Sequence, residues 1–125
     1  MTPAQQLPGG LARLADAVGT GRVGAIHLVA EALARIERLD GPLNAVVSLR
    51  ADQALAEAER LDASIRDGAR PGPLAGVPFL VKDLEDVAGL PTRHGSVLFA
   101  DAPPAIADGL VTARLKACCR RVFSP

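Results

Sequence analysis

One lysine in this sequence stands where a lysine is costly, at the end of an apolar run. Residues 77–81 are predicted to form a short buried strand that leads into Lys82, with Pro78 near its start, where a missing N–H is tolerated. A lysine carried inward by such a strand either extends its ammonium group to water or loses its proton. Half-neutrality of a lysine at neutral pH requires about 4.6 kcal/mol of differential desolvation. A neutral buried lysine accepts protons, so Lys82 is a candidate general base.

The same lysine has a simpler interpretation, in which its charge is solvated and paired with a neighbouring carboxylate. Asp83 and Asp86 lie close enough in the sequence to serve as that partner. Because structural ion pairs are more common than catalytic lysines, the chemistry of Lys82 alone leaves both interpretations open.

The residues around Lys82 form a longer pattern. It consists of Pro73-Leu74-Ala75-Gly76-Val77-Pro78-Phe79-Leu80-Val81-Lys82-Asp83, then Gly89-Leu90-Pro91-Thr92, Gly95-Ser96, Pro104 and Asp108. This pattern resembles the start of the amidase signature family, and the upstream helices with Leu43-Asn44-Ala45-Val46 between them are similar to that family's N-terminal segment. The resemblance implies an α/β, amidase-signature-type fold, of which this chain holds only the N-terminal helices and the first strand or strands.

The resemblance also implies an activity, the hydrolysis of amide carbon–nitrogen bonds by a triad of a serine, a cis-peptide serine and a lysine. Lys82 would be the lysine, which takes a proton through the bridging serine and so activates the nucleophilic serine. Backbone N–H groups would hold the oxyanion, and water would hydrolyse the acyl-enzyme. The implied substrate is a small-molecule amide, with no metal ion or cofactor, and a homo-oligomer is compatible with this interpretation.

Two alternatives remain beside the general amidase. The first is the glutaminase subunit of a tRNA-dependent amidotransferase, ranked lower because residues 83–96 look more like a general amidase. The second is a non-catalytic helical interaction module that binds a partner through uncovered apolar surface. Residues 93–96 could line a substrate cleft, although a surface turn is slightly preferred.

The two serines of the implied triad have no counterpart in this sequence. The family's Gly- and Ser-rich segment would lie downstream, and none of the four serines stands in such a loop: Ser48, Ser64, Ser96 and Ser124. Residues 1–116 are therefore assigned to the N-terminal part of an amidase domain, and residues 117–125 to a tail outside the family pattern. Codons for Cys118-Cys119-Arg120 read one base later would encode Ala-Ala-Gly, the expected continuation, so we hypothesise a frameshift. We expect the chain to be inactive alone and only marginally stable.

Composition argues against several other classes of protein. The 125 residues suit a single domain, and a formal net charge of zero argues against a nucleic-acid or anionic-membrane surface. Without a signal-peptide pattern or a long apolar run, a cytoplasmic protein is expected. No metal site is expected either, because the adjacent cysteines, the separated His27 and His94 and the acidic residues lack ligand spacing.

Helical periodicity predicts four helices that would position the lysine. They cover residues 11–18, 24–39 and 51–66, and a fourth begins near Asp108 as its N-cap. Asp40-Gly41-Pro42 is predicted to stop the second helix. Residues 43–49 are expected to form a short strand or an extended link, and residues 83–104 an irregular stretch.

Overall fold

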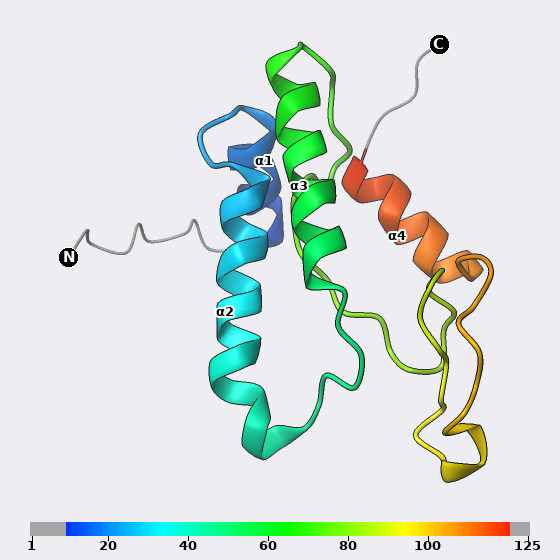
Figure 1. Ribbon diagram of the computed structural model, residues 1–125. Helices are drawn as coiled ribbons and strands as arrows, with labels where there is room; N and C mark the ends of the chain where they lie inside the picture. Colours follow the sequence, from blue (N-terminus) through cyan, green and yellow to red (C-terminus); the bar gives the residue numbers. More distant parts are fainter. Residues whose placement is uncertain (1–9, 121–125) are drawn as a thin grey trace.

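The structure is a computed structural model that describes residues 10–120, so Ser124 and most of the predicted tail lie outside it. Its helices are α1 (Leu11–Gly19), α2 (Ala25–Leu43), α3 (Ala51–Arg66) and α4 (Leu110–Arg120), with a short 3₁₀ helix η1 (Val97–Phe99). In Figure 1, α2 and α3 run side by side, and α4 stands apart from them at the end of a long irregular segment. The described residues therefore form a helical layer with one irregular arm.

The first three predicted helices are confirmed, two of them with nearly the predicted bounds. The bounds of α3 match the prediction, and α1 extends one residue further than expected. Helix α2 does not stop at residues 40–42 but continues through Pro42, because a proline in the last turn removes only one hydrogen bond from a helix that is about to end. The helix ends where Asn44 adopts a left-handed conformation, with φ 48° and ψ 42°, and its N–H donates to the Asp40 carbonyl at 2.6 Å.

The core lies between the first three helices and the turn that follows α3. It contains mostly small side chains, which allow close approach: Val18, Ala25, Leu28, Ala58 and Ala75. The Asp62 carboxylate, on α3, accepts hydrogen bonds from the first two backbone N–H groups of α2, at 2.7 and 3.1 Å. Since these N–H groups have no partner inside their own helix, Asp62 fixes the start of α2 against α3.

The strand predicted over residues 77–81 is not formed. These residues follow Gly76 without helix or strand assignment, and no ladder partner for them exists among the described residues. Their side chains are not buried as predicted either, because Phe79 and Leu80 are 37% and 66% exposed. A strand is defined by hydrogen bonds to a neighbouring strand, so a suitable apolar pattern cannot form one alone.

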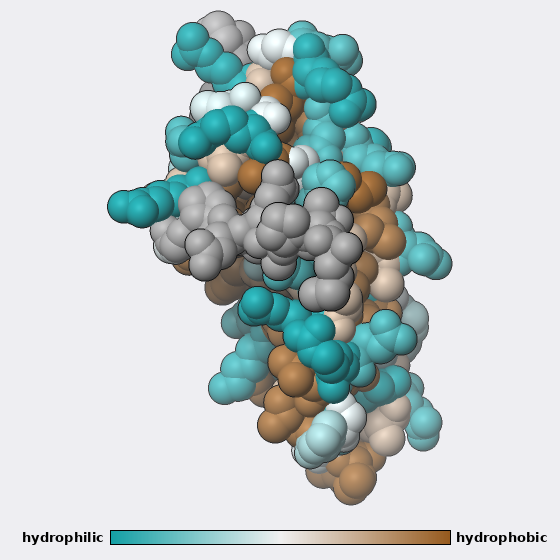
Figure 2. All heavy atoms as spheres, turned by 90° about the vertical axis from the view of Figure 1, so that its left-hand side faces the viewer, coloured by the Kyte–Doolittle hydropathy of each residue, from teal (hydrophilic) through white to brown (hydrophobic). Residues whose placement is uncertain are grey.

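The irregular arm carries apolar surface at its far end. Val97, Leu98 and Ile106 are almost fully exposed. In Figure 2 hydrophobic surface gathers at the lower end of the molecule, the height at which η1 lies in Figure 1. The arm itself is held by two isolated bridges, Ala88 with Ala105 and Pro91 with Pro104.

Asp108 joins α4 to this arm instead of capping the helix as predicted. Helix α4 starts two residues later, at Leu110. Both carboxylate oxygens of Asp108 lie 2.8 Å from Lys116 Nζ, and one of them also accepts the Ala88 N–H at 2.8 Å. The hydrogen bond from Lys116, followed by that from Ala88, holds the pKa of Asp108 below its usual 3.8.

This contact predicts a pH-dependent loss of stability. A carboxyl whose pKa is depressed in the folded state stabilises the fold above its unfolded pKa, and the effect is lost as pH falls through the folded pKa. At neutral pH, Asp108→Asn should therefore lower the free energy of unfolding by about 1–3 kcal/mol. Below about pH 4 the difference from the unmodified chain should shrink.

Urea titrations followed by circular dichroism at neutral and acidic pH would measure that difference. Asp16→Asn is the matched control, since Asp16 pairs with Arg22 at the surface, where both side chains are 64% exposed. Ion pairs between exposed side chains contribute little to the free energy of unfolding. A deficit of Asp108→Asn that stays constant across the pH range would contradict the assigned role.

Candidate active site

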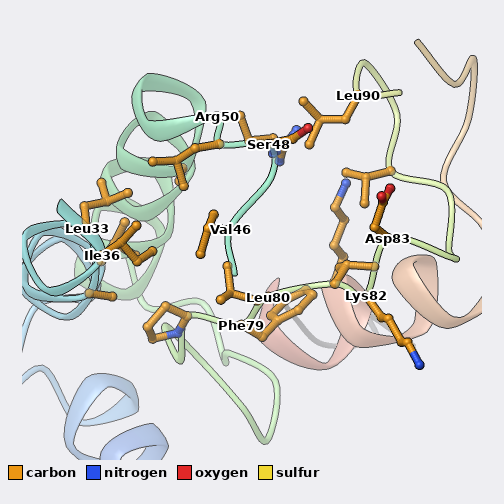
Figure 3. A pocket seen from close by; sticks show the side chains of 18 of the residues that line it. Leu33, Ile36, Val46, Ser48, Arg50, Phe79, Leu80, Lys82, Asp83 and Leu90 are labelled. Atoms are coloured by element: carbon orange, nitrogen blue, oxygen red, sulfur yellow. The ribbon is translucent and has the colours of Figure 1, made fainter. Parts of the chain in front are cut away.

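A large hollow lies between the α2–α3 layer and the segment that carries Lys82. Its volume is about 1020 Å³. Figure 3 shows Leu33 and Ile36 on one side and Phe79 and Leu80 below, with the link between α2 and α3 descending from the top into the middle of the view. Most of the lining residues are aliphatic, and charged side chains from the helices and from the Lys82 segment stand among them.

Lys82 lines this hollow at the end of the extended segment and remains exposed. Its carbonyl accepts hydrogen bonds from the N–H groups of Leu84 (2.7 Å) and Glu85 (3.0 Å), which turn the chain sharply after the lysine. The backbone of Lys82 is therefore fixed, whereas its ammonium group is not withdrawn from water within this chain.

Asp83 does not pair with Lys82, as the simpler interpretation expected, but holds a neighbouring loop. Its carboxylate accepts the N–H groups of Arg93 at 2.8 Å and Gly95 at 3.4 Å, and its carbonyl accepts the His94 N–H at 3.0 Å. His94 has a positive φ of 54° and packs against Phe99, with ring centroids 4.9 Å apart and the rings tilted by 57°. The loop at residues 93–95 is thus wrapped around Asp83, directly beside the candidate base.

Asp86, the other proposed partner, is also engaged elsewhere. Its carboxylate accepts a hydrogen bond from the Thr92 hydroxyl at 2.5 Å, and its carbonyl accepts the Gly109 N–H at 2.9 Å. Within residues 10–120, no ion pair involves Lys82. Both aspartates that could have neutralised the lysine instead build the turn and loop around it.

The loop at residues 93–96 lies at the surface, and part of it borders the hollow. His94 and Gly95 are exposed, as in a surface turn, yet both line the hollow. The Ser96 hydroxyl accepts the Leu98 N–H at 3.3 Å and caps η1, and Ser96 does not line the hollow. Among the serines that the structure describes, Ser48 alone lines the hollow, from the link before α3.

The extended link that was one of the two alternatives predicted for residues 43–49 is confirmed from residue 44 onward, whereas an ion pair at the hollow was not predicted. Val46, Ser48 and Arg50 occupy alternate positions of the link and are half-buried, while the residues between them are exposed, the period-two pattern of extended chain. Arg50 pairs with Glu57 at 2.5 Å, and both side chains are largely buried. The seven-residue spacing of these two charges, which places them on one face of α3 and its first turn, is the signal that could have revealed the pair.

A thiol also reaches the hollow. Cys119 Sγ donates to the Val77 carbonyl at 3.8 Å, and burial raises the pKa of the Cys119 thiol. A thiol with a raised pKa stays protonated at neutral pH and is a poor nucleophile. Helix α4 continues through Arg120, and the Cys118 carbonyl accepts the Leu74 N–H at 3.0 Å. The end of α4 is therefore packed against the turn that precedes Lys82.

Comparison with known proteins places this arrangement in a family. The family model described as Amidase matches residues 27–118, which include Lys82 and most of the residues that line the hollow. The chain belongs to the amidase family. The α/β fold class implied by the sequence pattern is thereby confirmed, although the described part of the fold is helical.

Two curated relatives illustrate the range of the family. Over 102 residues, the chain is 39% identical to the AtzE subunit of 1-carboxybiuret hydrolase from Pseudomonas sp. (strain ADP), with 82% of this chain and 22% of that protein covered. Over 107 residues it is 38% identical to a glutamyl-tRNA(Gln) amidotransferase subunit of Streptomyces coelicolor, with 85% and 21% covered. The chain thus spans about a fifth of the length of these relatives.

A solved structure supports the same assignment at the level of coordinates. It is described as "An unexpected vestigial protein complex reveals the evolutionary origins of an s-triazine catabolic enzyme" and superposes with a TM-score of 0.82 at 37% identity. The superposition covers 86% of this chain and 24% of that one. The helices and the irregular arm therefore keep the arrangement that they have in a much longer amidase-family chain.

Two further findings concern membrane spans and clusters of metal-binding side chains. None of the helices within residues 10–120 is long and apolar enough to cross a membrane. In the same part of the chain, no group of three or more His, Cys, Asp or Glu side chains could hold a metal ion.

Proposed function

We propose that this chain is the N-terminal part of an amide hydrolase in which Lys82 is the general base. The observation that carries the proposal is the turn at Lys82 and Asp83: the lysine has no carboxylate partner within the described residues, and its neighbours fix its backbone at the edge of an apolar hollow. The resemblance of residues 73–83 to the amidase signature pattern supports the assignment of the family's lysine to Lys82. Lys82 would cleave amides together with serines supplied by the part of the domain that follows residue 116.

The chemistry requires a desolvated lysine. Lys82 is exposed in this chain, so covering the hollow with the rest of the domain would bring the ammonium group out of water and favour its neutral form. Neutral Lys82 would then accept the proton of the bridging serine, which in turn accepts that of the nucleophile as it attacks the amide carbonyl. Return of this proton to the leaving nitrogen completes acylation, and water then releases the carboxylate.

A second candidate function remains within the same family. One relative, at 38% identity, belongs to an amidotransferase, so the same lysine could serve a glutaminase reaction. The two candidates differ in substrate: a glutaminase releases ammonia from glutamine, whereas a general amidase acts on other small amides. We continue to place the general amidase first, and we keep the division at residue 116 and the frameshift as predictions.

A covalent chimera would test the proposal. Residues 27–116 of this chain would replace the matching segment of the Pseudomonas 1-carboxybiuret hydrolase relative, expressed with whatever partner chains that relative needs. We expect ammonia release from an amide substrate by the chimera and none above background from the isolated chain, which lacks a nucleophile and an oxyanion hole. A chimera that folds as the relative does but hydrolyses neither glutamine nor small amides would refute the proposal.

A further inference from the structure

His94 borders two cavities. It lines the large hollow together with Lys82, and it also lines a second cavity of about 520 Å³, which Thr92 and residues 103–108 share. His94 therefore stands between the two cavities, at the boundary of the space that holds the candidate base. Its place in the chain is a loop that the proposed reaction has not yet used.

The backbone of His94 is held in an uncommon conformation. Its φ of 54° lies in the left-handed region, which few residues other than glycine adopt. Asp83 holds the loop on both sides of this point, because its carboxylate accepts the N–H groups of Arg93 and Gly95 and its carbonyl accepts the His94 N–H. Residues in such conformations persist where surrounding contacts fix them, and they gather at functional sites. The contact with Phe99 also limits the direction of the ring.

The imidazole of His94 has an unused hydrogen-bonding capacity. Neither of its ring nitrogens has a hydrogen-bond partner within the described residues. An imidazole presents at least one N–H donor in every protonation state. Three carboxylates that line its two cavities accept hydrogen bonds from other groups instead: Asp83, Asp86 and Asp108. His94 thus offers a free donor at the edge of the hollow.

The lining of the hollow indicates which ligand group would use this donor. Lys82 and Glu85 both line the hollow and have opposite charges, so the site does not favour one sign of charge on a ligand. Most of the other lining residues are aliphatic. Small-molecule sites of this kind gain affinity from apolar contacts and orientation from a few polar groups. An uncharged acceptor, such as a carbonyl group, therefore suits the His94 donor.

We propose that His94 is a specificity-determining residue, whose imidazole N–H donates to a carbonyl group of the substrate other than the amide that is cleaved. This inference rests on the proposed function, because it takes the hollow beside Lys82 as the substrate site. Lys82 and His94 reach the hollow from different segments, the turn and the loop, so the two groups address different parts of one substrate. An analogue without the carbonyl would leave the His94 donor without a partner, which lowers its rate relative to the carbonyl substrate.

Two matched amides would test this role. 6-Oxoheptanamide carries a ketone far from its amide, and 6-methylheptanamide has a methyl-bearing carbon in place of that ketone. In the chimera of residues 27–116 with the Pseudomonas relative, His94→Leu should lower the ratio of their kcat/KM values by about fivefold or more. Both rates come from the same sample, so the ratio does not depend on how much of the variant is folded. A smaller change would overturn the inference.

Two further variants show whether a hydrogen bond is responsible. His27→Leu is the matched control, because His27 is exposed on α2 and does not line the hollow. It should leave the ratio unchanged. His94→Gln keeps N–H donors on its side-chain amide and should retain most of the preference. Equal losses in His94→Leu and His27→Leu, or a loss in His94→Gln as large as that in His94→Leu, would overturn the inference.

The role of His94 and the proposed function can fail separately. If the folded chimera hydrolyses neither amide, the proposed function is rejected. Saturation-transfer NMR would then compare the binding of the same two amides to this chimera with and without His94→Leu. A loss of binding confined to 6-oxoheptanamide would sustain the inference without a catalytic Lys82. Unchanged binding of both amides would overturn it together with the proposed function.

Discussion

Replacing Lys82 with methionine in the active chimera should lower kcat by at least about 10³-fold, as removal of a member of a catalytic triad does in other hydrolases. Methionine keeps most of the length of the lysine side chain but accepts no proton. Ammonia release under saturating substrate would measure the effect. A loss of this size with little change in KM would indicate that the lysine acts on the reaction barrier and not on substrate binding.

Lys82→Arg separates proton transfer from charge. Arginine preserves a positive charge at the same place but does not deprotonate in proteins, so this variant should be as inactive as Lys82→Met. The matched control is Lys116→Met, the chain's other lysine, which pairs with Asp108. That change should reduce thermal stability yet leave most of kcat. Substantial activity in Lys82→Arg would contradict a role as base.

Gly76→Ala should destabilise the chain strongly, by about 3 kcal/mol or more. Gly76 has a φ of +69°, a conformation that L side chains rarely adopt. An added Cβ would also lie 2.9 Å from both Ala25 Cβ and Val18 Cγ1, in the centre of the core. Because that core is closely packed, the contact cannot be relieved locally.

Two other glycines separate the causes of this loss. Gly68 has a φ of +90° and open space around it, so Gly68→Ala should show the backbone cost alone, about 1 kcal/mol. Gly41 lies in α2 with open space, and Gly41→Ala should be neutral or stabilising by up to about 1 kcal/mol. Urea unfolding followed at the helical circular dichroism band would compare the three. If Gly76→Ala lowers the free energy of unfolding no more than Gly68→Ala does, the core must rearrange to accommodate the added methyl group.

Local sequence determined most of the helices, and that is why they were predictable. Periodic apolar residues and the break at residues 19–21 define α1, and the run of helix-forming residues defines α3. The end of α2 was less predictable, because Asn44 and the Asp40 carboxylate end the helix together, and the carboxylate accepts the N–H groups of Ala45 and Val46. Caps of this kind depend on side-chain direction, which a pattern of residue types does not contain.

The candidate residue Lys82 stands out in the sequence, but its surroundings do not. The position of Lys82 after an apolar run was visible in the sequence, whereas its exposure was not, because exposure depends on residues far away in the chain. The same holds for Asp83, whose carboxylate could have joined the neighbouring lysine but joins a loop ten residues further on. Asp108 likewise reaches Ala88, twenty residues away. Such long-range polar contacts are fixed by the fold as a whole.

The segment from Gly76 to Asp83 is held in place at both of its ends. One end is held in the helical core at Gly76, where no room remains for even a methyl group, and the other is held by the loop that clasps Asp83. The six residues between them span at most about 20 Å when extended, so the segment can move little along its own direction. Sideways movement is restrained far less, since residues 78–81 have no backbone partner within residues 10–120. Whatever completes this domain therefore needs to supply only lateral support to bring the lysine to a reproducible position.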